Sequence, residues 1–244
     1  MPDATLLLLH AGFLLVSVLY SVTGHGGASS YIAIMVLLGM APQEIRPMAL
    51  GLNVIVSLIA SVQFYRAGYF NKSLFLPFAL SSVPMAYLGG TLQIADASFK
   101  LLLGIALLVA AFRLVPRERN RPVVAQGHIA IPILAGLCIG FVSGLIGIGG
   151  GIFLTPLLIL MGWATPKQAA AVSAPFILVN SVAALAGTFS QQADLPGYFA
   201  LSALTVTLGG LAGSYLGSRK LPNTAIARVL SGILVLAGLK LCLA

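Results

Sequence analysis

Charged residues are absent from several long stretches of this 244-residue sequence, and no other feature limits its possible folds as strongly. The stretches without Asp, Glu, Lys or Arg are 4–43, 47–65, 73–95, 122–166, 168–193 and 195–218. A membrane-spanning helix requires about 20 predominantly apolar residues, so the longest stretch has room for two. Only 7% of the residues are charged, whereas about a quarter are charged in a typical soluble domain. We therefore predict an all-α polytopic protein in the lipid bilayer.

The few charges are concentrated at the ends of the apolar segments. The formal net charge is +8. A nucleic-acid-binding protein carries such a surplus on a soluble basic face, whereas charges at segment ends orient a membrane protein, so nucleic acid is not an expected partner. Cys138 and Cys242 lack metal-ligand and disulfide spacing and are interpreted as buried thiols. The N-terminal apolar run begins with Asp3 and lacks a cleavage site, which favours a retained first helix over a signal peptide.

Glycines, prolines and charge clusters divide the chain into ten predicted apolar segments. These are 5–22, 28–40, 48–64, 74–93, 101–115, 129–146, 152–163, 169–189, 198–216 and 225–244. The strongest polar interruption lies almost at the midpoint and contains Arg117, Glu118, Arg119 and Arg121. We therefore expect a first transmembrane repeat at 1–115, a basic cytoplasmic linker at 116–127 and a second transmembrane repeat at 128–244.

Several landmarks of the first half recur in the second half at a slowly drifting offset, which indicates a duplication. The matched residues are Gly26 and Gly150, Pro42 and Pro166, Asn53 and Asn180, Tyr87 and Tyr215, and Lys100 and Arg228. With five segments per half, a cytoplasmic linker places most Lys and Arg residues on the cytoplasmic side, as the positive-inside rule requires. Four crossings per half would divide them almost evenly. The sequence thus favours two inverted repeats of about five hydrophobic segments each.

The second segment of each half is too short for an ordinary span. Segment 28–40 would reach only about 20 Å at ~1.5 Å per residue, against a hydrocarbon core of ~30 Å. A glycine-rich turn precedes each of these short segments, 28–40 and 152–163. The turn glycines are Gly24, Gly26 and Gly27 in the first half, and Gly147, Gly149, Gly150 and Gly151 in the second. We predict helices broken by glycine; whether the short segments cross the bilayer or re-enter is left open.

A helix that begins at such a break directs unsatisfied N–H groups back at it, and this arrangement attracts anions. Irregular backbone at membrane depth is tolerated only inside protein or beside a water-filled cavity. Matched breaks in inverted halves are typical of the substrate site of a secondary transporter. The alternative is that these glycines only permit close helix packing. Because the pair is duplicated, we favour the binding site.

The Gly147-Ile148-Gly149-Gly150-Gly151 turn, with Pro156 and Pro166 behind it, resembles the TauE/SafE family of sulfite exporters. The central basic loop and the duplication extend this resemblance over the whole chain. It implies transport of small sulfur-containing anions, such as sulfite or organosulfonates, across a prokaryotic plasma membrane. The first-half turn departs from the pattern, because His25 stands among its glycines and Ala28, Ser29 and Ser30 follow.

Further polar side chains are candidates for this site. Asn53 and Asn180 could donate to an anion oxygen or join helices. His25 could attract an anion or couple its movement to protons, or it could be a neutral residue bonded to backbone. Arg46 is expected to pair with Glu44 or to steer anions. Further hydroxyl donors are Ser29, Ser30, Ser57, Thr155, Ser173 and Ser181.

The predicted function is that of a secondary transporter that exports its substrate by alternating access. A passive anion channel and a non-transporting membrane assembly scaffold are the alternatives. No catalytic triad, carboxylate pair, phosphate-binding loop or Cys/His metal cluster is recognisable, so neither an enzyme nor a cofactor is expected. The expected partners are the small anion and the bilayer, and a homodimer is compatible with the sequence. The identity of the anion, the direction and the coupling ion are not encoded in these patterns.

Overall fold

The computed structural model describes residues 3–92, 128–191 and 195–243, and these parts of the chain are helical. The predicted segment 101–115 and the linker 116–127 lie outside the described residues. The first half contains α1 (Asp3–Val22), α2 (Ala28–Leu37), α3 (Pro42–Arg66) and α4 (Lys72–Thr91). The second contains α6 (Ala130–Ile146), α7 (Gly151–Leu160), α8 (Pro166–Phe189), α9 (Phe199–Tyr215), the π-helical turn η1 (Leu216–Lys220) and α10 (Asn223–Leu243). The predicted helical class is confirmed.

Local sequence accounts for where these helices begin. Pro42 and Pro166 lie in the first turns of α3 and α8, where the missing proline N–H costs nothing. At α8, Thr165 and Gln168 form a capping box, each side chain bonding the other's backbone. Asn71 accepts from the backbone N–H of Leu74 and caps α4.

Within the described residues, five helices are long and apolar enough to cross a membrane. The corresponding spans are Thr5–Val22, Gln43–Arg66, Lys72–Thr91, Pro166–Phe189 and Phe199–Lys220. In the most apolar 18-residue window of α3 and of α8, 61% of the residues are buried inside the protein, the largest share among the five. Leucines such as Leu7, Leu37 and Leu80 are exposed on the outer helices. This distribution is that of a multi-pass membrane protein whose outer face contacts lipid.

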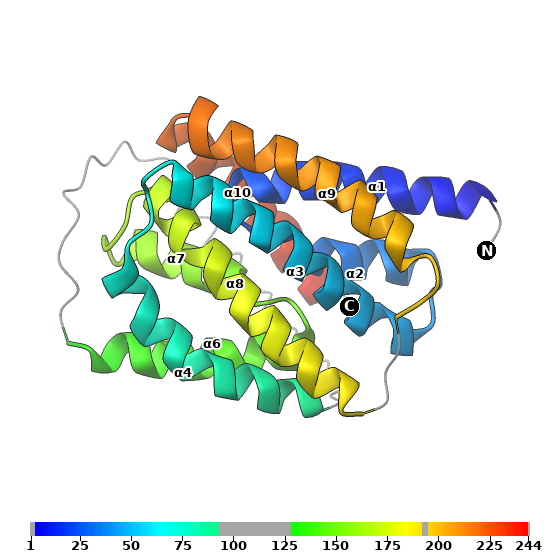
Figure 1. Cartoon of the computed structure of the whole chain (residues 1–244), viewed down its shortest axis with the longest axis horizontal. Helices are drawn as coiled ribbons and strands as arrows, with labels where there is room; N and C mark the ends of the chain where they lie inside the picture. The colour runs from blue at the N-terminus through cyan, green and yellow to red at the C-terminus, as the bar shows by residue number, and fades with distance from the viewer. Residues whose placement is uncertain (1–2, 93–127, 192–194, 244) are drawn as a thin grey trace.

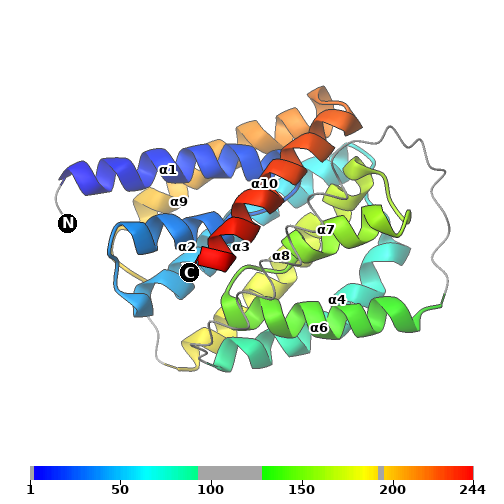
Figure 2. The ribbon, with the colours of Figure 1, turned by 180° about the vertical axis from the view of Figure 1, so that it is seen from behind.

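Around the central helices α3 and α8, helices of the first half pack against helices of the second half. α3 packs against α8, and Figure 1 shows them running in opposite directions. α4 of the first half packs against α6 of the second, and α1 of the first half packs against α9 of the second, as both views show (Figures 1 and 2). This reciprocal pattern fits a duplicated chain. The inverted-repeat relation itself stays a prediction.

Glycines on one face of α6 and α9 allow these exchanged contacts to be close. A Cβ at Gly140 would lie 2.3 Å from the Ser82 carbonyl oxygen of α4. One at Gly213 would lie 2.1 Å from the Val18 carbonyl oxygen of α1. Both helices therefore approach backbone to backbone, as small residues at four-residue spacing permit in membranes.

One prediction is wrong here: Cys138 on α6 is exposed rather than buried, because it lies away from the face that packs against α4. The Cys242 side chain lies outside the described part.

Candidate functional site

The two glycine turns break their helices as predicted. Gly24 and Gly27, which flank the first break, have φ values of +73° and +93°. Gly147, Gly149 and Gly150 in the second have φ values between +73° and +84°. Residues with a Cβ rarely adopt this left-handed backbone conformation, so glycine is required there. The helices that follow, α2 and α7, have only 10 residues each.

Both turns lie between the central helices α3 and α8, where they meet the opposite half. A Cβ at Gly24 would lie 2.5 Å from the Ala170 carbonyl oxygen of α8. A Cβ at Gly149 would lie 2.4 Å from the Asn53 Nδ2 atom of α3. A Cβ at Gly151 would lie 3.3 Å from the His25 ring. The structure therefore brings the two predicted turns into direct proximity.

Asn53 is the side chain that links both turns. It is 1% exposed. Its Nδ2 donates to the Ser181 hydroxyl of α8 over 2.8 Å, and its Oδ1 accepts from the backbone N–H of Ala28 over 3.4 Å. Because Gly27 at the N-cap of α2 has no side chain, Asn53 supplies the cap from a neighbouring helix. Gly26 is needed for this contact, since a Cβ there would lie 1.8 Å from Asn53 Oδ1.

His25 joins the first turn to the second half through a chain of hydroxyls. Its Nδ1 lies 2.8 Å from the Thr23 hydroxyl and 3.0 Å from the Thr23 carbonyl. Its Nε2 lies 3.2 Å from the Thr155 hydroxyl of α7, which donates to Ser173 of α8 over 2.7 Å. Thr155 and Ser173 are two of the predicted hydroxyl donors. Thr23 was missed, although its place two residues before a turn histidine favours such local bonding.

Asn180 is placed differently from Asn53. It is fully buried, but its Nδ2 donates to the Phe176 carbonyl of its own helix over 2.9 Å. Its Oδ1 has no hydrogen-bond partner within the described part of the chain. The side chain beside the second turn is Ile177, which a Cβ at Gly151 would approach to 2.1 Å.

The start points of the central helices explain this difference. α3 and α8 begin at Pro42 and Pro166, which are 124 residues apart. The same separation relates Asn53 to Ile177, whereas Asn180 lies three residues further along α8. The asparagines match in the sequence but not in their surroundings.

The remaining predicted residues lie around the turns with other neighbours. The Ser29 hydroxyl lies 3.1 Å from the Tyr20 hydroxyl of α1, and Ser30 shares that partner at 2.6 Å. A Cβ at Gly150 would meet Ile139, Phe176 and Ser143, all side chains of the second half. Gly27 faces Val16 and Tyr31, and Gly147 faces the Arg46 stem.

Arg46 does not form the expected ion pair with Glu44. Its guanidinium donates instead to the carbonyls of Gly89 and Leu92, each at a distance of 2.7 Å, and also to the carbonyl of Gly144. These carbonyls end α4 and α6, where a cation offsets the helix dipole. Glu44 accepts from the Tyr198 hydroxyl over 2.9 Å. Burial, followed by the bond to Glu44 and its charge, raises the pKa of Tyr198, so this hydroxyl remains a donor at neutral pH.

No Asp, Glu, Lys or Arg side chain is fully buried near the turns in the described residues, and Arg46, whose stem lies against Gly147, is partly exposed. The buried side chains with polar groups there belong to Ser, Thr, Asn, His and Tyr, and the described residues form no group of three metal-ligating side chains. Backbone N–H groups at the starts of α2 and α7, neutral side-chain donors and the partly exposed Arg46 are therefore what this region offers to a ligand. Such a set suits an anion better than a cation.

The fold is that of a multi-pass membrane protein, and paired helix breaks of this kind are typical of transporters. Residues 8–241 match the family described as sulfite exporter TauE/SafE, so the chain belongs to that family. It is 35% identical to the probable membrane transporter protein y4hK of Sinorhizobium fredii over 94% of this chain and 95% of that one. It is 26% identical to the probable membrane transporter protein YjnA of Bacillus subtilis over 93% of this chain and 96% of that one. No solved structure matches. The family and these names indicate a transporter rather than an enzyme.

Proposed function

We propose that this transporter exports small sulfur-containing anions, such as sulfite or organosulfonates, across a prokaryotic plasma membrane by alternating access. The observation that carries the proposal is the meeting of two glycine breaks between α3 and α8, with Asn53 in contact with both. The family description supplies the substrate class. A passive channel and an assembly scaffold make different predictions for the flux experiments below.

Backbone amides do most of the binding in this proposal. An oxyanion placed between the turns would face the N-termini of α2 and α7, whose first N–H groups have no intrahelical acceptor. Asn53 supplies a neutral donor from α3. Asn180 lies nearly one helical turn beyond Ile177 on α8 and has a secondary role. The proposed substrate-binding residues are Gly24, His25, Gly26, Gly27, Ser29, Asn53, Gly147, Gly149, Gly150, Gly151 and Asn180.

The contacts that join the two halves support alternating access in this proposal. Asn53 and Ser181 bridge α3 and α8, and His25, Thr155 and Ser173 bridge the first turn to α7 and α8. Both bridges consist of uncharged groups, so breaking them exposes no buried ion. When one half rocks against the other, the Asn53 amide can exchange the Ser181 hydroxyl for an anion oxygen. The binding energy of the anion thereby offsets the cost of opening.

A basic end of the molecule supports the proposed orientation of the chain in the membrane. Arg66 and Arg219 line a common groove, and the Lys167 amine lies 3.4 Å from the Tyr69 hydroxyl in the α3–α4 connection. The backbone N–H of Lys167 also donates to Asn223 at the start of α10. Cations at the end of α3, at the start of α8 and in η1 therefore gather at the same end of the molecule. We propose that this end is cytoplasmic, together with the linker 116–127.

Flux of labelled sulfite, taurine, sulfate and chloride in proteoliposomes, with and without a pH gradient, tests the substrate and the mechanism. We expect saturable flux of a sulfur oxyanion. Conductance without saturation would indicate a channel, and absence of flux for the whole panel would favour the scaffold.

Two matched glycines test the site. Gly149→Ala and Gly162→Ala impose similar backbone strain, since the two φ values are +73° and +71°. Only Gly149 would place its Cβ against Asn53 and Ser181, whereas Gly162 faces open space. We expect Gly149→Ala to lower flux at least about tenfold and Gly162→Ala to leave it nearly unchanged. Asn53→Ala, which removes atoms instead of adding them, should lower flux as well. Equal effects of the two glycine variants, with full flux in Asn53→Ala, would remove the turns from the mechanism.

A further inference from the structure

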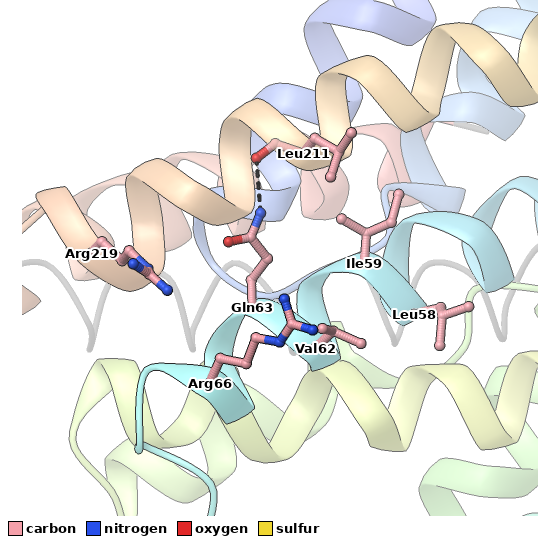
Figure 3. Close-up of a pocket in the computed structure, with 7 residues that line it drawn as sticks. All are labelled: Leu58, Ile59, Val62, Gln63, Arg66, Leu211 and Arg219. Carbon is pink, nitrogen blue, oxygen red and sulfur yellow. Dashed lines mark hydrogen bonds between the residues drawn. The ribbon is translucent and has the colours of Figure 1, made fainter.

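Away from the turns, two arginines from different halves line one groove at the basic end. Arg66 is the last residue of α3, and Arg219 belongs to η1 at the end of α9. The groove has a volume of about 300 Å³, and Figure 3 shows both arginines with Gln63 between them. Its remaining lining is apolar, from Leu58, Ile59, Val62 and Leu211. The groove thus combines a hydrocarbon-like wall with two cations.

Neither arginine has an anionic partner within the described part of the chain. Arg219 lies over the Tyr215 ring, with 5.8 Å between the guanidinium carbon and the ring centroid. The Arg66 side chain makes no hydrogen bond or ion pair with the described residues, and both arginine side chains are exposed. Gln63 is engaged by the backbone, because its Nε2 donates to the Leu211 carbonyl over 3.3 Å. The two guanidinium groups are therefore available to an external anion.

A second groove begins on the other side of the same arginine. It has a volume of about 320 Å³ and shares Val62 and Arg66 with the first. Its other lining residues are Ser61, Tyr65, Phe70 and Pro175. Arg66 thus stands at the head of two largely apolar grooves on either side of α3. Both spans that carry the arginines end at this level, which places the groups at the membrane interface.

We propose that this double groove binds an anionic phospholipid, with its phosphate between Arg66 and Arg219 and its acyl chains along the two apolar grooves. The apolar lining matches acyl chains, and the guanidinium pair selects a negative headgroup over a neutral one. A free inorganic anion would leave the apolar walls unmatched. Because Arg66 belongs to the first half and Arg219 to the second, the bound headgroup also joins the two halves at this end.

Native mass spectrometry of the detergent-purified chain measures this binding directly. Titration with phosphatidylglycerol should give at least tenfold tighter binding than titration with phosphatidylcholine. The variant Arg66→Gln/Arg219→Gln should lose that preference. Lys220→Gln removes an adjacent exposed cation outside the groove and should keep it. Equal phosphatidylglycerol binding by wild type and the double variant, or loss of the preference in Lys220→Gln, would overturn the proposal.

A second measurement separates a lipid from a small free anion. Thermal unfolding is measured in two parallel series. One contains dioctanoyl phosphatidylglycerol below its critical micelle concentration, and the other contains inorganic phosphate at the same concentration. The short-chain lipid should raise the unfolding temperature of wild type but not of the double variant, and phosphate should have little effect on either. An equal shift by phosphate, lost in the double variant, would make the groove a small-anion site and refute the lipid assignment. Neither assay depends on transport, so its failure would leave the proposed export function untouched.

Discussion

Asn53 on α3 and Ile177 on α8 lie beside the two glycine turns at corresponding distances from their helix starts, but one is polar and the other apolar. Asn53 bonds the start of α2 and Ser181, whereas Ile177 only fills space beside Gly149 and Gly151. Hydrogen bonds therefore hold the start of α2 at Asn53, whereas packing alone holds the second turn at Ile177. This difference shows that matching positions of α3 and α8 have different chemical surroundings at the turns.

Asn53→Ile is the change with the largest expected effect. It places an apolar side chain beside the turns on α3, as Ile177 already does on α8. It removes two hydrogen bonds and leaves the Ser181 hydroxyl buried without its partner, at a cost of about 2 to 3 kcal/mol. We expect the free energy of unfolding in detergent to fall by that amount and flux in proteoliposomes to fall at least about tenfold.

A companion variant separates stability from transport in this comparison. Asn53→Ile/Ser181→Ala removes the stranded hydroxyl, so it should recover part of the lost stability without recovering flux. Recovery of both would show that Asn53 acts only as a structural link between α3 and α8.

Ile177→Asn makes the opposite change and should have an intermediate effect. The side chain is 2% exposed, and a carboxamide there would be buried beside Gly149 and Gly151 with fewer packing contacts. We expect a loss of about 2 kcal/mol in the free energy of unfolding, measured by denaturant titration in detergent. Flux should fall less than in Asn53→Ile. Unchanged stability would mean that water already reaches this side of the turns.

Asn180→Ala should have the smallest effect of the three. Its Oδ1 is unpartnered in the described residues and its Nδ2 bonds only its own helix, so the loss should stay near 1 kcal/mol. Flux should remain within about threefold of wild type, in keeping with a secondary role. If Asn180→Ala instead matched Asn53→Ala, its carboxamide would contact the substrate and the two halves would bind it more equally.

Much of the helical framework could be predicted from the sequence. Nine of the ten predicted segments lie on described helices whose bounds agree to within a few residues, except that α3 begins at Pro42, ahead of the predicted 48. The reason is local: apolar runs, prolines in first turns and left-handed glycines determine where a helix can start and stop. The short helices after Gly27 and Gly150 were predicted on the same grounds.

Contacts between distant residues could not be predicted in this way. Arg46 next to Glu44 suggested an ion pair, but the carbonyls at the ends of α4 and α6 reach the guanidinium and take its place. The match of Asn53 with Asn180 missed Ile177, because a shift of three residues is small in an alignment but nearly a full helical turn in space. The groove at Arg66 and Arg219 joins residues 153 positions apart and had no local signal.

The sequence by itself determined that this chain lies in a membrane, where its helices break and which breaks correspond. Each of these depends on properties of nearby residues: hydropathy, missing charges, and the backbone freedom of glycine. The tertiary structure alone decided that both turns meet at Asn53, that Ile177 faces the second turn and that two arginines share one groove. Such contacts depend on how far one helix slides and rotates against another, and that is set by packing of the whole bundle.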